Sequence, residues 1–169
     1  VAPNSFGGYL AVATEMSALG RPPDRVFESV SFLGTHSAVV EAVVSGEFDC
    51  GIVRTQVLEQ HADRYGLDIN NLRVIRPAGI YHHRSFPFVC STRLYPEWPM
   101  AVLPNVDTSF ATTVAAALMS IDSGDAAAVV SGISGWTIAA NYQPVRDTLR
   151  VVGAPPYANT EGPTLRESL

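Results

Sequence analysis

The chain has 169 residues, 47% of them hydrophobic, and carries a formal net charge of −5. This length and composition are typical of one globular domain, with or without a tail, and they argue against extensive disorder. The acidic balance argues against a nucleic-acid partner or an anionic membrane surface held by bulk charge. Lysine is absent from the sequence, which excludes a lysine nucleophile, a Schiff base and any lysine-dependent phosphate loop.

Strand-like and helical segments alternate along the first part of the chain. The apolar residues Leu10, Ala13 and Met16 recur at helical spacing, and Gly20 follows them as a stop. Short apolar or alternating runs between the helices are typical of strands. The expected helices cover residues 6–19, 35–45 and 55–65, and the expected strands cover residues 1–3, 26–33, 48–53, 72–76 and 86–91.

The later part of the chain is predicted to be helical and to end in a polar tail. Asp107 opens an alanine-rich helix to about residue 121, and shorter helices are expected at 124–132 and 144–149. Residues 153–169 contain three prolines and few large apolar side chains, which predicts a linker or a disordered end after a folded part at 1–152. No run is long enough to cross a bilayer, and Val1 begins abruptly in an apolar segment without a signal peptide. We therefore expect a piece of a longer protein.

The alternation of strands and helices also predicts the fold class. Parallel strands joined by helices form βαβ units, whose sheet is covered on both faces. The sequence therefore predicts an α/β fold, a three-layer αβα sandwich with a mostly parallel sheet of about five strands. Cys50 and Cys90 lie in expected strands and are expected to be buried thiols, while the sequence leaves open whether they are bonded.

Three strand-to-helix turns share small hydroxyl residues. They are "PNSFGG" at residues 3–8, "GTHS" at residues 34–37 and "VRT" at residues 53–55. In an open parallel sheet such turns share the carboxyl edge, where helix N-termini offer unpaired amides to an anion. His36 and Arg54 would add cationic or donor contacts to that anion site. The alternative is plain capping, because Ser, Thr and Asn are common N-cap residues of any helix.

Other reactive residues do not form a recognisable site. Ser5, His36 and Asp49 could be arranged as a triad, but nothing in the sequence places them together, and "NSFGG" is not the Gly-x-Ser-x-Gly elbow. The adjacent His82 and His83 have no third metal ligand nearby in the sequence. We therefore expect no catalytic residue, no metal ion and no cofactor in this chain.

Four segments together carry a resemblance to a known family. They are "NSFGGY", "GTHSAVVEAVVSGEFDCGIVRTQVLE", "FPFVCSTRLYPEWP" and "GWTIAANYQPVRDTL", and they follow one another in the family's order between Val1 and about Tyr157. The chain resembles the phosphonate-binding-type (type II) periplasmic binding protein domain. More narrowly, "STRLYPEWP" and "VRT" are similar to the extracytoplasmic sensor region of tetrathionate-sensor-like histidine kinases.

The resemblance implies two α/β lobes joined by hinge strands, with a small anion, such as an oxyanion, held in the cleft between the lobes. This chain would be the C-terminal lobe, the N-terminal lobe of the same chain would be missing, and the exposed cleft face would favour a homodimer. The implied function is ligand sensing for a two-component histidine kinase, in the periplasmic part of an inner-membrane protein. The alternative is the substrate-binding component of an ABC transporter for phosphonate-like anions.

The resemblance also indicates which residues bind the ligand. The Ser-Thr helix start that grips the anion in phosphonate binders corresponds to Ser5 and Phe6, and Phe6 lacks the hydroxyl, which argues against the same phosphonate contacts. His36 matches the histidine of the family's Gly-x-His turn, and Arg54 and Thr55 match the sensor branch. The expected ligand-binding residues are Asn4, Ser5, Phe6, Gly7, Thr35, His36, Arg54 and Thr55.

Overall fold

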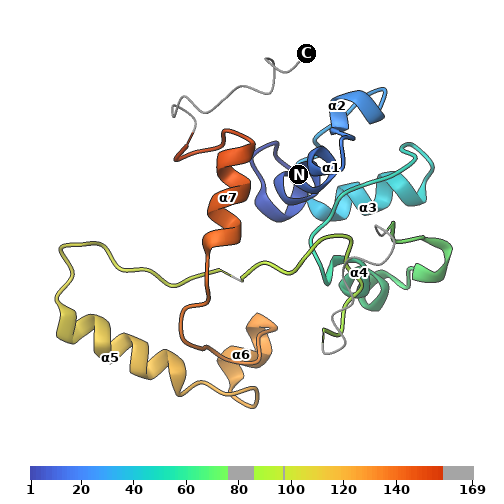
Figure 1. Cartoon of the computed structure of the whole chain (residues 1–169). Helices are drawn as coiled ribbons and strands as arrows, with labels where there is room; N and C mark the ends of the chain where they lie inside the picture. Colours follow the sequence, from blue (N-terminus) through green and yellow to red (C-terminus); the bar gives the residue numbers. More distant parts are fainter. Residues whose placement is uncertain (76–85, 97, 158–169) are drawn as a thin grey trace. The chain divides into compact units, whose positions relative to one another are not determined.

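The computed structural model describes residues 1–75, 86–96 and 98–157, and every regular element in these ranges is a helix (Figure 1). In chain order they are the π-helix η1 (Phe6–Leu10), α1 (Ala11–Ala18), α2 (Pro23–Val26), α3 (His36–Val44), α4 (Val57–Tyr65), the 3₁₀ helix η2 (Ile69–Asn71), α5 (Thr108–Met119), α6 (Ala126–Ser131) and α7 (Gln143–Val151).

The predicted αβα sandwich with a parallel sheet is wrong, because no residue in the described ranges lies in a strand. Within the described ranges, the segments expected as strands are irregular apart from Val26, the last residue of α2. Single residues such as Phe27 and Leu72 have extended backbone angles. Alternating apolar residues favour an extended chain with one side packed, but a ladder also needs a second strand at about 4.8 Å. Val30 and Phe32 are each 41% exposed, so the segment at residues 26–33, expected as a strand, is not covered on both faces as a sandwich requires.

The helix predictions are largely confirmed, because their signals lie within the helices themselves. The hydroxyl of Thr35 accepts a hydrogen bond from the amide of Ala38 at 3.1 Å and caps α3. The carboxylate of Asp107 accepts from two first-turn amides of α5. Gly66, with a φ of 68°, ends α4 in the left-handed conformation that glycine adopts without steric cost.

The chain divides into two compact units. Unit 1 comprises Val1–Tyr95 and Gln143–Leu169, and unit 2 comprises Pro96–Tyr142. The buried core of unit 1 comes mainly from α1 and α3, with a contribution from α4, and α1 also packs against α7. Its buried hydrophobic residues are Leu10, Ala11, Ala13, Val39, Val40, Ala42 and Val57.

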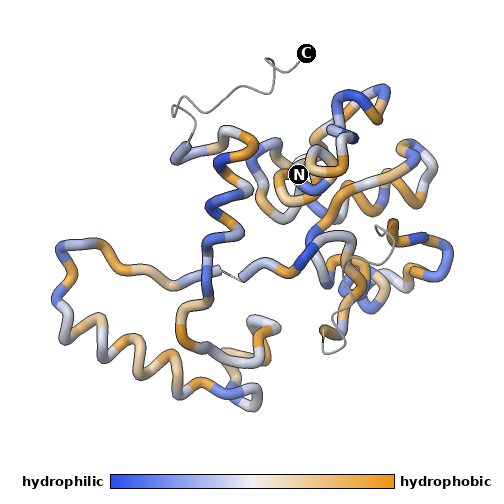
Figure 2. The backbone as a smooth tube through the Cα atoms, viewed as in Figure 1, coloured by the Kyte–Doolittle hydropathy of each residue, from blue (hydrophilic) through white to orange (hydrophobic). Residues whose placement is uncertain are grey.

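Unit 2 contains α5 and α6 and exposes many of its apolar side chains. Ala128 is fully buried, whereas Phe110 on α5 is 62% exposed and Val130 on α6 is 88% exposed. The sequence from Thr108 to Ile121 contains no charged residue, and Figure 2 shows hydrophobic positions along α5. The burial of apolar surface that stabilises unit 1 is therefore sparse in unit 2.

Both cysteines are free thiols. Cys50 is exposed and Cys90 is half-buried, so the expectation of two buried thiols is wrong for Cys50. Cys50 is exposed because the sheet predicted to bury it does not form, and residues 48–53 are not covered by other layers.

Candidate functional site

The first of the three turns leads into the π-helix η1. Ser5 has an extended backbone, and its carbonyl accepts from the amides of both Tyr9 (3.0 Å) and Leu10 (3.1 Å). A bond spanning five residues opens a wider turn than an α-helix, and such turns are frequent at functional sites. The side chain of Ser5 does not cap the helix, and Asn4 before it is exposed.

The first and third turns lie side by side at Gly7 and Arg54. A Cβ atom added to Gly7 would lie 3.4 Å from the Cβ of Arg54, which is ordinary van der Waals contact. His36, in the second turn, is close enough to Arg54 for the guanidinium charge to lower the pKa of the imidazole. The structure therefore places Gly7 of the first turn against Arg54 of the third, with His36 of the second turn within range of the Arg54 charge, although no sheet edge aligns the three turns.

His36 combines a buried atom with a shifted protonation equilibrium. Burial lowers the pKa of His36 below its ordinary value of 6.5, and the positive charges of Arg54 and of the chain's amino group lower it further. The Nδ1 atom of His36 is buried and has no hydrogen-bond partner among the described residues. An unpaired buried polar atom costs about 1–3 kcal/mol, so a group that bonded to it would be favoured.

The two threonines of these turns play different parts. Thr35 is the N-cap of α3, which agrees with the plain-capping alternative for that residue. Thr55 does not begin its helix, because α4 starts at Val57. Gln56, which lies between Thr55 and Val57, has a φ of 72°. This is the one positive φ among non-glycine residues in the described part of the chain. Such a conformation is uncommon for glutamine and reflects local strain in the turn that follows Arg54.

Phe6 belongs to a different environment from that of Gly7. Its ring packs edge-on against the ring of Tyr95, with centroids 4.9 Å apart. Tyr95 is part of the "RLYPEWP" motif, and aromatic side chains of this kind bury a large apolar area while keeping one polar group. Phe6 therefore links the first turn to the segment around residues 92–95.

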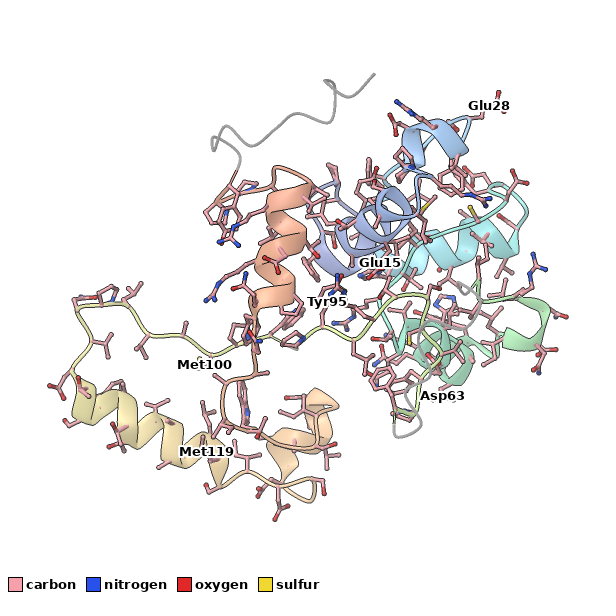
Figure 3. The ribbon with its side chains drawn as sticks, in the orientation of Figure 1. Glu15, Glu28, Asp63, Tyr95, Met100 and Met119 are labelled. Atoms are coloured by element: carbon pink, nitrogen blue, oxygen red, sulfur yellow. The ribbon has the colours of Figure 1, made fainter. Side chains whose placement is uncertain are left out.

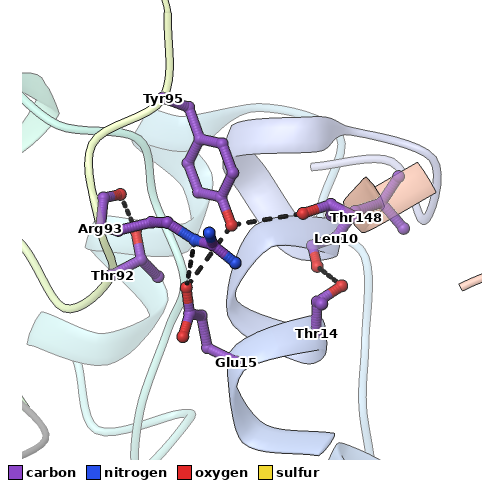
Figure 4. Close-up of polar contacts among 7 residues, drawn as sticks. All are labelled: Leu10, Thr14, Glu15, Thr92, Arg93, Tyr95 and Thr148. Atoms are coloured by element: carbon purple, nitrogen blue, oxygen red, sulfur yellow. Dashed lines mark hydrogen bonds and ion pairs between the residues drawn. The ribbon is translucent and has the colours of Figure 1, made fainter. Parts of the chain in front are cut away.

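A polar network around Tyr95 was missed by the sequence reasoning (Figure 4). The Nε atom of Arg93 donates to Glu15 Oε1 at 3.2 Å, and Tyr95 Oη donates to the same oxygen at 3.5 Å. Tyr95 Oη also lies 3.3 Å from Thr148 Oγ1. The sequence offered one indication of this network. Glu15 is the sole charged residue in the helical segment "FGGYLAVATEMSAL", and a lone acid in an apolar helix needs a polar partner. Figure 3 labels Glu15 on α1 and Tyr95 beside it.

The surroundings of Arg93 favour its charged form. Desolvation by itself would lower the pKa of Arg93, but Tyr95 and Glu15 together raise it above its ordinary value. The side chain of Glu15 is only 15% exposed, against 46% for Arg93. The carboxylate is thus well shielded from water, which competes less for its hydrogen bonds than it would at an exposed surface pair.

Two negative findings apply to the described ranges. They contain no group of three or more His, Cys, Asp or Glu residues that could hold a metal ion, while His82 and His83 lie outside them. No helix within residues 1–75, 86–96 and 98–157 has the length and apolar character needed to span a bilayer.

The family model described as "ABC transporter, phosphonate, periplasmic substrate-binding protein" matches residues 1–148. The chain belongs to this family. A phosphonate-type periplasmic substrate-binding domain is an extracytoplasmic module for a small-molecule ligand, and that coarse part of the prediction is confirmed. Neither the curated proteins nor the solved structures include a significant match to the chain.

Membership in the phosphonate-type binding family covers all three turns and the Glu15–Arg93–Tyr95–Thr148 network, because the matched range extends to residue 148. It does not distinguish a sensor from a transporter component. The roles of the individual turn residues therefore stay predictions, carried by the approach of Gly7, His36 and Arg54.

Proposed function

We propose that the chain binds a small oxyanion at the three turns. The single observation that carries this proposal is the approach of His36 and Gly7 to Arg54. Arginine offers a planar fork of donors that suits an oxyanion, and Gly7 leaves room beside it for a ligand to approach the backbone. The N-terminus of α3, which begins at His36, adds amide donors and the positive end of a helix dipole.

His36 gives the proposed site a pH-sensitive component. Its lowered pKa leaves the imidazole neutral at neutral pH, where it can still donate one hydrogen bond. A bound anion would offset the repulsion from Arg54 and favour the imidazolium form. Binding would therefore take up a proton, and the anion would bind more tightly as the pH falls.

We further propose that this anion site serves a two-component sensor, as the extracytoplasmic part of an inner-membrane histidine kinase. The resemblance of "RLYPEWP" and "VRT" to the sensor branch supports the proposal. A ligand that binds one conformation better shifts the population toward it, which is the signal such a receptor passes on. The second candidate is a transporter's substrate-binding component, which the description of the matched family favours.

The binding proposal is tested by thermal-shift measurements on the full 169-residue chain with sulfate, phosphate, thiosulfate and methylphosphonate. An anion at 100 times its Kd should add about 2.7 kcal/mol to the free energy of unfolding. Arg54→Ala should abolish the shift. Arg73→Ala, which removes the same charge from another exposed position outside the three turns, should keep it. The proposal fails if no anion raises the Tm of the unaltered chain, or if both variants lose the shift equally.

The sensor proposal has a separate readout in the full-length gene product. A sensor predicts a kinase module whose autophosphorylation changes with the anion that the thermal-shift screen selects. A gene that ends close to Leu169, with no kinase module, would instead identify a transporter component.

A further inference from the structure

The Glu15–Arg93–Tyr95–Thr148 network lies where the chain leaves and re-enters unit 1. Tyr95 is the last residue of unit 1 before unit 2, and Gln143, at the start of α7, is the first residue after it. Thr148 lies on α7, five residues beyond that return. We call the two points where the chain passes between the units the chain crossings. The carboxylate of Glu15 on α1 accepts directly from Tyr95 at the first crossing, and it is linked through Tyr95 to Thr148 on α7, which follows the second crossing.

The direction of each hydrogen bond in the network follows from its donors and acceptors. An ionised Glu15 can only accept, so Arg93 Nε and Tyr95 Oη both donate to it. The single hydroxyl proton of Tyr95 is then used, and Thr148 Oγ1 must be the donor at 3.3 Å. The result is a one-way chain from Thr148 through Tyr95 to Glu15. Thr148 is 1% exposed, so its hydroxyl has no access to water as an alternative partner.

The same tyrosine also contacts the proposed anion site. The ring of Tyr95 packs on Phe6, which is the first residue of η1 and the neighbour of Gly7. A shift of η1 on anion binding would move Phe6 against Tyr95, and a shift of Tyr95 would move both of its hydrogen bonds. The crossings and the first turn are thus joined by direct contacts.

We propose that Glu15, Tyr95 and Thr148 form a hydrogen-bonded clamp that holds both chain crossings to α1, and that Phe6 couples this clamp to the anion turn. The coupling rests on the proposed anion site, whereas the clamp itself does not. Coupling of this kind is reciprocal, so an anion that the clamp helps to bind must also strengthen the clamp.

The clamp is tested by measuring one distance with spin labels inside unit 1. The labels are placed on the exposed Cys50 and on an Arg146→Cys substitution in α7, in the 169-residue chain carrying Cys90→Ala. Without any anion, the clamp predicts a single narrow distance. Tyr95→Phe, which keeps the ring but removes the hydroxyl, should replace that narrow distance with a broad distribution.

Two further variants separate the clamp from a general loss of packing. Thr148→Val keeps the shape of the side chain but removes the donor, and it should broaden the distance as Tyr95→Phe does. Asp147→Asn weakens the exposed ion pair of Asp147 with Arg150 on the same helix, and it should leave the distance narrow. The clamp is overturned if the unaltered chain already shows a broad distance, or if both Tyr95→Phe and Thr148→Val leave it narrow.

The coupling is tested by adding sulfate to the labelled Tyr95→Phe chain. Saturating sulfate should restore part of the narrow distance, and Tyr95→Phe should weaken sulfate binding. If sulfate stabilises the unaltered chain in the thermal-shift assay but leaves the Tyr95→Phe distance broad, the coupling is wrong. If sulfate and the other oxyanions bind nowhere, the proposed function and the coupling both fail, while the anion-free distances still decide the clamp.

Discussion

At the scale of single residues, His36 is the position where burial and charge act in the same direction. Both disfavour its imidazolium form and lower its pKa, and its Nδ1 atom is buried without a partner among the described residues. The unfolded chain binds a proton to this side chain more readily than the folded chain does. The contribution of His36 to stability is therefore fully present above about pH 6.5 and is lost as the pH falls through the depressed pKa of the folded state.

The lowered pKa of His36 predicts how sulfate affinity depends on pH. Sulfate keeps its double negative charge across the range in which histidine titrates, so any pH dependence must come from the protein. Affinity measured by calorimetry should rise from about pH 8 to about pH 5.5, with proton uptake in buffers of different ionisation enthalpy. His36→Gln should flatten this dependence, whereas His61→Gln in α4 should leave it unchanged. A pH-independent affinity would contradict the assignment of His36 to the site.

Gly51 offers a second residue-scale prediction, which concerns the core of unit 1. An added Cβ would lie 2.6 Å from Val39 Cγ1 and 3.0 Å from Val43 Cγ2, and valine side chains in a helix have little freedom to move aside. Gly51→Ala should lower the free energy of unfolding by about 1–3 kcal/mol.

Chemical denaturation measures this loss, with Gly7→Ala as the matched control. The new methyl group at Gly7 meets its nearest neighbour, the Cβ of Arg54, at 3.4 Å, so the midpoint for Gly7→Ala should stay close to that of the unaltered chain. A Gly51→Ala midpoint as close to that of the unaltered chain as the Gly7→Ala midpoint would show that the chain does not pack on α3 at Gly51.

The sequence made the turn residues visible as candidates but gave little indication of the Glu15–Arg93–Tyr95–Thr148 network. Polar residues at Ser5, Thr35 and Arg54 follow a local pattern, and a turn followed by a helix can be recognised from neighbouring residues alone. The contact between Glu15 and Arg93 joins residues 78 apart, and Tyr95 reaches Thr148 across 53 residues. No local pattern contains such a contact, so a lone acid in an apolar helix was the only available sign.

At the scale of elements, α5 begins in an exposed segment where its N-cap has little tertiary help. Asp107 accepts from the amides of Ser109 at 2.9 Å and Phe110 at 3.2 Å, and it also accepts from the hydroxyl of Ser109. These bonds, led by that from the Ser109 hydroxyl, lower the pKa of Asp107. The cap is therefore present above the ordinary carboxyl pKa and is lost as the pH falls through the lowered value.

Replacement of this cap should loosen the start of α5. In Asp107→Ala the first-turn amides lose their acceptor, and amide hydrogen exchange at Ser109 and Phe110 should speed up. Asp107→Ser, which keeps a capping oxygen, should restore most of the protection. Protection unchanged by Asp107→Ala would show that the first turn of α5 does not depend on this side chain.

Helices and strands differed in how far the sequence determined them. Each helix is closed by bonds within its own segment, so caps such as Thr35 and stops such as Gly66 are enough to locate it. A strand is completed only by a partner elsewhere in the chain. The alternation at residues 26–33 indicated extended structure, but it contained no information about pairing, and the predicted sheet is wrong for that reason.

At the scale of the whole molecule, the proposed function depends on segments that are distant in the sequence. The family match over residues 1–148 shows an extracytoplasmic ligand-binding module. In unit 1 the first turn lies against the third at Gly7 and Arg54, and the Arg54 charge acts on His36 of the second turn. The tail boundary at residue 152, the homodimer and the additional lobe stay predictions of the sequence. The proposed anion site requires only residues within unit 1, which makes it testable in this chain.

The most direct test of the central claim is a sulfate titration followed by backbone amide chemical shifts in a ¹⁵N-labelled chain. Anion binding at the three turns predicts saturable shifts concentrated at Gly7, His36 and Arg54, with the amides of unit 2 unaffected at low occupancy. Shifts that are scattered over exposed arginines such as Arg21 and Arg25, or that never saturate, would contradict the account.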